Sequence, residues 1–125
     1  MPTTPVSSRS PAAGAKLHRT TTQSIPTGAL TALSFDEVLY DTSGFYSAGQ
    51  PTRLTIPAGL AGRYLIGGSC EFASNATGRR GYILFRNGDT EGIGVLVTGV
   101  VSGGDAEGCV TVLYNLAAAD FVTFQ

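Results

Sequence analysis

Residues 63–72 read RYLIGGSCEF, and their side chains alternate in character along the run. Tyr64, Ile66, Cys70 and Phe72 share one parity, whereas Arg63, Ser69 and Glu71 share the other. Because successive side chains of a β-strand point to opposite faces, this alternation predicts a strand with one buried face. We therefore expect the apolar set to point into a core.

Short runs of similar character lie on both sides of this strand, separated by turn-forming residues. They predict further strands at residues 16–22, 53–56, 80–86, 93–101, 110–116 and 121–125, and at 29–40 a strand region that runs into an irregular loop. The dipeptide Asn87-Gly88 tolerates positive φ and predicts a tight hairpin after residue 86. About eight short strands with no helical period predict an all-β, two-sheet sandwich or barrel.

Two glycine-containing stretches add detail to this pattern. Residues 93–101 (IGVLVTGVV) carry apolar side chains on both parities, which favours burial on both faces. Residues 102–108 (SGGDAEG) are expected to form a turn, and Gly92, Gly94, Gly103 and Gly104 are interpreted as turn glycines. They lack the strand–turn–helix setting in which glycines bind phosphate.

The composition supports one domain built of strands and narrows the range of partners. The chain has 125 residues, 17 glycines, no tryptophan and 14 % charged residues, which suits short strands and glycine-rich turns. A formal charge of −1 offers no electrostatic footprint for nucleic acid. No run approaches the roughly 20 apolar residues of a membrane span, and the N-terminus lacks the apolar core of a signal peptide. We expect no nucleic-acid partner and no membrane.

The N-terminal segment differs from the rest of the chain. Residues 1–14 (MPTTPVSSRSPAAG) contain three prolines and almost no large apolar side chain. Such a segment cannot bury enough surface to offset its ordering entropy, so it predicts an extended N-terminal arm ahead of a domain at residues 15–125. We expect Pro5, Val6 and Pro11 to dock on a neighbouring chain.

Two cysteines are too few for a disulfide scaffold. Cys70 has the inward parity of its strand, whereas Cys109 has the parity opposite Val112 and Tyr114. Side chains on opposite faces cannot bring their Cβ atoms to the roughly 4 Å that a disulfide needs, so both thiols are expected to stay reduced.

The residues that could perform chemistry are few and scattered. His18 is the only histidine, and it has no metal ligand or nucleophile elbow at the spacing that zinc binding or Ser-His-Asp catalysis requires. Three carboxylate pairs fall in predicted turns without the order of a calcium loop: Asp36 with Glu37, Asp89 with Glu91, and Asp105 with Glu107. The arginines are expected to make ion pairs at the rim: Arg63, Arg79, Arg80 and Arg86. The sequence therefore predicts a protein that is not an enzyme and has no cofactor or metal.

Five pieces of the sequence resemble the jelly roll shared by tumour necrosis factor and the complement globular-head domains. They are FD at 35–36, YDTSGFY at 40–46, RLTIPAGLAGRYLIGGSCEF at 53–72, RRGYILFRNG at 79–88 and AAADFVTFQ at 117–125. In that family a short strand, a proline turn and a long core strand opening with an aromatic follow one another, and Ile56-Pro57 and Tyr64 match this order. The resemblance implies a two-sheet antiparallel jelly-roll sandwich that associates as a homotrimer.

The sequence departs from that family in two places. Ala119 stands where the family usually has glycine. The family also ends with one more strand in the centre of one sheet, and this sequence stops before it. A truncated sequence, a neighbouring element that fills the gap and a shorter relative of the fold are the alternatives.

Small trimeric modules of this kind occur on bacteriophage particles, and the Thr/Ala/Gly-rich composition with a proline-rich arm is similar to theirs. The first hypothesis is a homotrimeric virion structural protein at the virion surface, assembled in the host cytoplasm, which decorates a capsid or belongs to a tail appendage. Its other partners would be the major capsid protein or a tail protein. The alternatives are a fibre head that binds a host receptor or glycan, and a sandwich-fold hydrolase whose remaining residues lie beyond residue 125.

The trimer hypothesis rests on an excess of apolar side chains. A sandwich strand needs only one apolar face, yet residues 93–101, 110–116 and 121–125 carry apolar side chains on both. An exposed apolar face of this size marks an interface. The residues expected in the subunit interface are Leu96, Val100, Leu113 and Phe121.

Overall fold

The computed structural model describes residues 12–88, 90–99 and 105–125. Within them the chain forms eight strands and no helix, and every strand pairing is antiparallel. The predicted all-β class with antiparallel sheets is therefore confirmed. The strands are β1 (Ala15–His18), β2 (Glu37–Asp41), β3 (Arg53–Thr55), β4 (Gly62–Phe72), β5 (Arg80–Arg86), β6 (Gly92–Thr98), β7 (Ala106–Leu116) and β8 (Phe121–Phe124).

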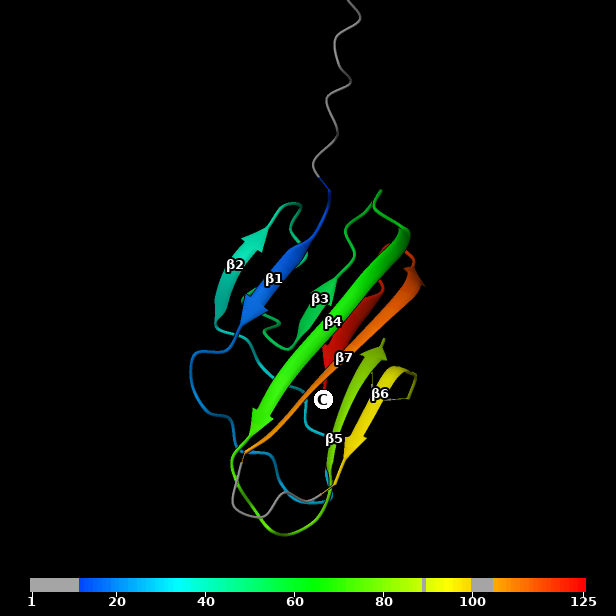
Figure 1. The fold of residues 1–125 in the computed structure, drawn as a ribbon. Coiled ribbons are helices and arrows are strands. Elements are labelled where there is room, and N and C mark those ends of the chain that lie inside the picture. The colour runs from blue at the N-terminus through cyan, green and yellow to red at the C-terminus, as the bar shows by residue number, and fades with distance from the viewer. Residues whose placement is uncertain (1–11, 89, 100–104) are drawn as a thin grey trace, which may run out of the picture.

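The strands form one four-stranded sheet and two ribbons. The sheet has the order β3-β8-β5-β6, and the ribbons are β1-β2 and β4-β7. Figure 1 shows the long β4–β7 ribbon crossing in front of the four-stranded sheet, with the β1–β2 ribbon beside it. Across the described ranges, no helix has the length and apolar character needed to cross a bilayer.

The core lies between the β4–β7 ribbon and the four-stranded sheet. Its two buried clusters draw on both layers: Phe45, Ile56, Leu116 and Val122 in one, and Tyr82, Leu84, Val110 and Phe124 in the other. The half-buried Ile66 of β4 packs against both clusters. The alternation predicted for β4 is found, with Tyr64, Ile66, Cys70 and Phe72 turned toward this core.

Glycines let the two layers approach closely. A Cβ atom at Gly108 of β7 would lie 2.5 Å from Cε2 of the fully buried Tyr82 of β5. A Cβ atom at Gly94 of β6 would lie 2.7 Å from Cγ1 of Val110. Both glycines belong to strands and face the core, so their interpretation as turn glycines was wrong, as it was for Gly92, the first residue of β6. Gly103 and Gly104 lie outside the described residues.

The first predicted strand is shorter than expected, because side-chain hydrogen bonds take over after His18. The guanidinium of Arg19 donates to the carbonyl and hydroxyl oxygens of Ser34, at 3.0 and 2.7 Å. The amide and hydroxyl of Thr20 both donate to the carboxylate of Asp36. These bonds hold residues 19–22 against the loop before β2 instead of in a ladder. The predicted strand at 29–40 is likewise reduced to β2.

The other strand boundaries agree more closely with the prediction. β5 matches residues 80–86, and β7 begins at Ala106, inside the stretch expected to be a turn. Asn87 and Gly88 have φ of 55° and 115°, the positive values predicted for them. The connection is longer than the predicted tight hairpin, because residues 87–91 separate β5 from β6. Ala119 has φ of 70°, a conformation that favours glycine. Ala119, which stands where the family that the sequence resembles usually has glycine, thus occupies a left-handed backbone position.

Candidate assembly surfaces

The outer face of the β4–β7 ribbon carries two exposed leucines that touch no core. Leu65 is 76 % exposed and Leu113 is 58 % exposed, and they are direct cross-strand partners. We call them the outer leucine pair. Directly opposed side chains on one face of an antiparallel ribbon lie close enough to form a single apolar patch. The parity of Leu65 against Tyr64 and Ile66 in the sequence could have identified it, but it was not among the predicted interface residues.

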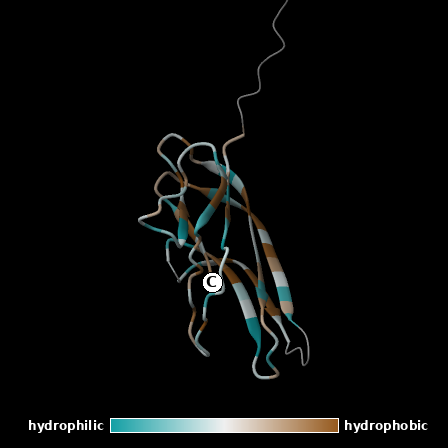
Figure 2. Ribbon diagram, turned by 90° about the vertical axis from the view of Figure 1, so that its left-hand side faces the viewer, coloured by the Kyte–Doolittle hydropathy of each residue, from teal (hydrophilic) through white to brown (hydrophobic). Residues whose placement is uncertain are grey.

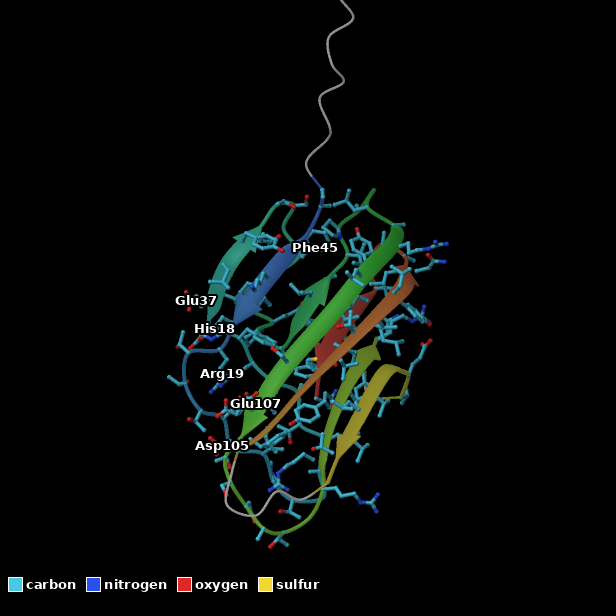
Figure 3. The ribbon with its side chains drawn as sticks, viewed as in Figure 1. His18, Arg19, Glu37, Phe45, Asp105 and Glu107 are labelled. Carbon is cyan, nitrogen blue, oxygen red and sulfur yellow. The ribbon has the colours of Figure 1, made fainter. Side chains whose placement is uncertain are left out.

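The same face becomes polar toward its other end. Small residues occupy the middle, and Glu71 and Glu107 then face each other across the ribbon. Hydrogen bonding to Asp105 and to Glu107, together with their charges, raises the pKa of Glu71 above its usual range. Figure 3 shows Asp105 and Glu107 at this end of the ribbon. The outer face therefore carries the outer leucine pair toward one end, next to Arg63 and Asn115, and carboxylates at the other end.

A second apolar patch lies on the outer face of the four-stranded sheet. Val95 and Val97 of β6 are 60 % and 55 % exposed, and we call them the outer valine pair. The prediction that this strand is buried on both faces was therefore wrong for β6 within a single chain. Leu96 has the opposite parity and packs against the core beside Tyr82. Its place in a subunit interface stays a prediction. Figure 2, coloured by hydropathy, shows hydrophobic and hydrophilic stretches following one another along the strands.

The other predicted interface residues do not gather on one surface. Leu113 is exposed on the ribbon, whereas Phe121 is half-buried in β8, with the guanidinium of Arg53 4.2 Å from the centre of its ring. Val100 lies outside the described residues, and so do the three residues expected to dock the arm: Pro5, Val6 and Pro11.

A groove separates β1 from β4. It has a volume of about 1020 Å³, and residues 15–22 and 66–72 line its two sides. Leu33, Val122 and Phe124 are among the apolar residues that line it between these sides. We call it the β1–β4 groove. Among the described residues β1 pairs only with β2, and β4 only with β7, so the groove separates two strand edges.

His18 stands at the rim of the groove. Its Nδ1 lies 3.2 Å from Oε2 of Glu37, and both side chains are exposed. Figure 3 shows this pair at one edge of the molecule, with Arg19 between it and Glu107. In the described ranges no group of three or more His, Cys, Asp or Glu residues is arranged to hold a metal ion. Glu37 and Glu107 lie in strands, contrary to the turns predicted for them.

A polar network ties the end of the β5–β6 hairpin to the turn before β8. Arg86 pairs with Glu91 at 2.9 Å, and Tyr114 donates a hydrogen bond to the same carboxylate at 2.9 Å. Hydrogen bonding to Glu91 raises the pKa of Tyr114. Asn87 donates to Asp120, whose pKa is lowered by that bond. Each of these groups has a partner within the chain, so the network is structural.

The loop after β2 is organised by one carboxylate. Asp41 accepts backbone N–H bonds from residues 43–46, the shortest at 2.9 Å. Burial would raise the pKa of Asp41, but these four donors outweigh it and hold the pKa below its usual range. The loop places the buried ring of Phe45 against Tyr64, edge to face at 5.9 Å. Asp41 therefore serves the core.

Both cysteines are free, as predicted. Cys70 packs against the core and lines the β1–β4 groove, and its burial raises the pKa of its thiol. Cys109 is exposed on the outer face of the ribbon. The two thiols lie on opposite faces of neighbouring strands, which is why they form no disulfide.

Comparison with known proteins gives no relative from which a function could be transferred. No protein-family model matches the chain, and neither a curated protein nor a solved structure matches it. The surfaces described above are therefore the basis for inferring what the protein does.

Proposed function

We propose that this protein is a non-enzymatic structural module of a bacteriophage particle that works as a homotrimer with a jelly-roll fold. The observation that carries the self-association is the outer leucine pair. Two large apolar side chains, each more than half exposed and directly opposed, lie on a strand face that contributes nothing to the core of its own chain. Unpartnered apolar patches of this kind are typical of protein interfaces.

The presence of a second patch favours a ring over a twofold dimer. The outer leucine pair and the outer valine pair lie on outer faces of different layers. A twofold contact joins the same surface of two subunits, whereas a ring joins two different surfaces of each. Two separate apolar patches fit the second arrangement, and the resemblance to trimeric jelly rolls sets the expected number at three.

The jelly-roll assignment and the virion location rest on the resemblance of the sequence. The strand order β3-β8-β5-β6 beside a β4–β7 ribbon is compatible with a two-layer jelly roll. Attachment through the N-terminal arm to a capsid or tail protein completes the proposal. Mass spectrometry of purified particles tests the location, with a copy number divisible by three as the expected result.

The self-association is tested by measuring mass in solution. Sedimentation velocity of the full chain should give three times the chain mass of 12.9 kDa. Leu113→Asp should give a folded monomer, because a charge in the patch cannot be buried without a partner. Leu30→Asp is the matched control, since Leu30 is a 55 % exposed leucine outside every strand. A monomeric parent chain, or equal masses for the two variants, would contradict the proposal.

A further inference from the structure

Asn87 and Gly88 form the only Asn-Gly pair of the sequence, in the connection between β5 and β6. Asparagine deamidates most readily before glycine, which places no side chain around the attacking nitrogen. The backbone nitrogen of Gly88 attacks Cγ of Asn87 and closes a succinimide ring, and its proton leaves with the NH₂ group as ammonia. Water then opens the ring to aspartate or isoaspartate. Asn87 is exposed, so water reaches it.

The fold holds both ends of the Asn87 carboxamide. Its Nδ2 donates to Oδ1 of Asp120 at 2.9 Å, and its Oδ1 accepts from the N–H of Phe121 at 2.9 Å. The backbone N–H of Asn87 donates to the carbonyl oxygen of Phe121, also at 2.9 Å. Ring closure must bring Cγ within bonding distance of the nitrogen of Gly88, and the two side-chain hydrogen bonds oppose this movement. The folded chain should therefore deamidate slowly.

The product of the reaction does not fit the same contacts. Deamidation replaces the Nδ2 donor by a carboxylate oxygen, which would face Oδ1 of Asp120 with no hydrogen atom between them. Asp120 also accepts from the N–H of Ala117 and lies 3.7 Å from Nη1 of Arg86, two contacts that favour its ionised form. Two ionised carboxylates at this distance repel each other. Isoaspartate would in addition lengthen the main chain by one carbon atom, directly after the pairing of Arg86 with Val122.

We propose that Asn87 is a deamidation site that reacts in the unfolded chain and is protected in the folded one, and that its product weakens the junction between β5 and β8. The change is not reversed on refolding, so the junction records whether a chain has been unfolded. The other two asparagines, Asn75 and Asn115, precede alanine and leucine, whose side chains slow the same reaction. The site lies within one chain and does not depend on the proposed assembly.

Peptide mapping by mass spectrometry tests the site. The full chain is incubated at neutral pH, either folded or unfolded in guanidinium chloride, and deamidation at position 87 is followed over time. The rate should be roughly tenfold or more lower in the folded chain, because two hydrogen bonds must break before the ring closes. In the unfolded chain, Gly88→Ala should slow the reaction. Equal rates in the two states, or no effect of Gly88→Ala, would overturn the proposal.

A substitution in the folded chain tests the protection. Asp120→Ala removes the acceptor of Nδ2 and should speed deamidation at Asn87. Asp36→Ala is the matched control, because both carboxylates accept from one backbone N–H and one side-chain donor, but those of Asp36 belong to Thr20. Circular dichroism confirms that both variants are folded. Equal rates for the two variants would show that Asp120 does not protect Asn87.

Refolding tests the effect of the product. Chains kept unfolded until Asn87 has deamidated should, after refolding, melt at a lower temperature than chains refolded at once. Asn87→Asp supplies the aspartate product directly, and its loss should shrink toward pH 3.8, the ordinary pKa of aspartate, where a protonated carboxyl can donate again. Asn75→Asp is the control and should melt like the parent, since its side-chain oxygen still accepts from the N–H of Thr77. Equal melting of deamidated and freshly refolded chains would overturn the proposed effect on the junction.

Discussion

The two faces of the β4–β7 ribbon have opposite properties. On the inner face, Gly108 lies so close to Tyr82 that one added carbon atom does not fit. On the outer face, Leu65 and Leu113 face each other outside the core clusters and are mostly exposed. The inner face therefore determines whether the chain folds, and the outer face is available for association. Substitutions on the inner face should therefore change the free energy of unfolding, and substitutions on the outer face should change the state of association.

The largest effect is expected on the inner face. Gly108→Ala should lower the free energy of unfolding by about 3 kcal/mol, because the fully buried ring of Tyr82 has nowhere to move. Urea denaturation followed by circular dichroism measures it. Gly81→Ala is the matched control, since a Cβ at this strand glycine meets no atom within 4 Å. Equal losses for the two alanines would show that the close approach at Gly108 is not tight.

The end of the ribbon offers a stabilising change. Ala119 holds a left-handed backbone, which costs an alanine about 1–2 kcal/mol, partly offset because glycine loses more entropy on folding. Ala119→Gly should therefore raise the free energy of unfolding by about 0.5–1 kcal/mol. The neighbouring exposed Ala118 has no positive φ, so Ala118→Gly should lower it. A loss at both positions in thermal melts would contradict the strain at Ala119.

The outer face should separate folding from association. Leu65→Asn together with Leu113→Asn should abolish the trimer, yet change the unfolding free energy of the separated chain by no more than about 0.5 kcal/mol. Sedimentation velocity reports the first quantity, and urea titration at low protein concentration reports the second. A large loss of stability in the separated chain would mean that the outer leucine pair belongs to a core within the chain.

The sequence predicts where the strands lie better than it predicts which face of each strand points to the core and which points outward. The alternation along β4 and the positive φ of Asn87 and Gly88 follow from local chemistry and agree with the structure. Gly108 was interpreted as a turn residue because a glycine needed for close packing looks the same in a sequence as one needed for a turn. Leu96 was predicted to face outward although Val95, Leu96 and Val97 are all apolar, so that both faces of the strand look alike in the sequence. Only the pairing of Leu96 with the buried Tyr82 shows which of the two faces points to the core.

The candidate surfaces were harder to predict for the same reason. Leu113 was identified from its strand alone, but Leu65 becomes part of the patch only through the register between β4 and β7. The β1–β4 groove arises because two ribbons stand side by side without pairing, and no local pattern encodes that separation. The bonds of Arg19 and Thr20 that end β1 also join segments 15 and 16 residues apart.

The smallest effect is expected at the acidic end of the outer face, and it depends on pH. The Asp105 and Glu107 carboxylates raise the pKa of Glu71 above its usual 4.5, so the folded chain holds that proton more tightly than the unfolded chain does. Stability linked to this proton is present below the usual pKa and is lost as the pH rises through the raised value. Glu71→Gln removes this loss. In the dissociated chain carrying Leu65→Asn and Leu113→Asn, Glu71→Gln should raise the melting temperature at neutral pH and leave it unchanged at a pH below 4.5. Glu37→Gln serves as the control, because Glu37 faces His18 instead of another carboxylate, and it should give no gain at neutral pH. An equal gain from Glu71→Gln at both pH values would show that the repulsion across the ribbon is not its cause.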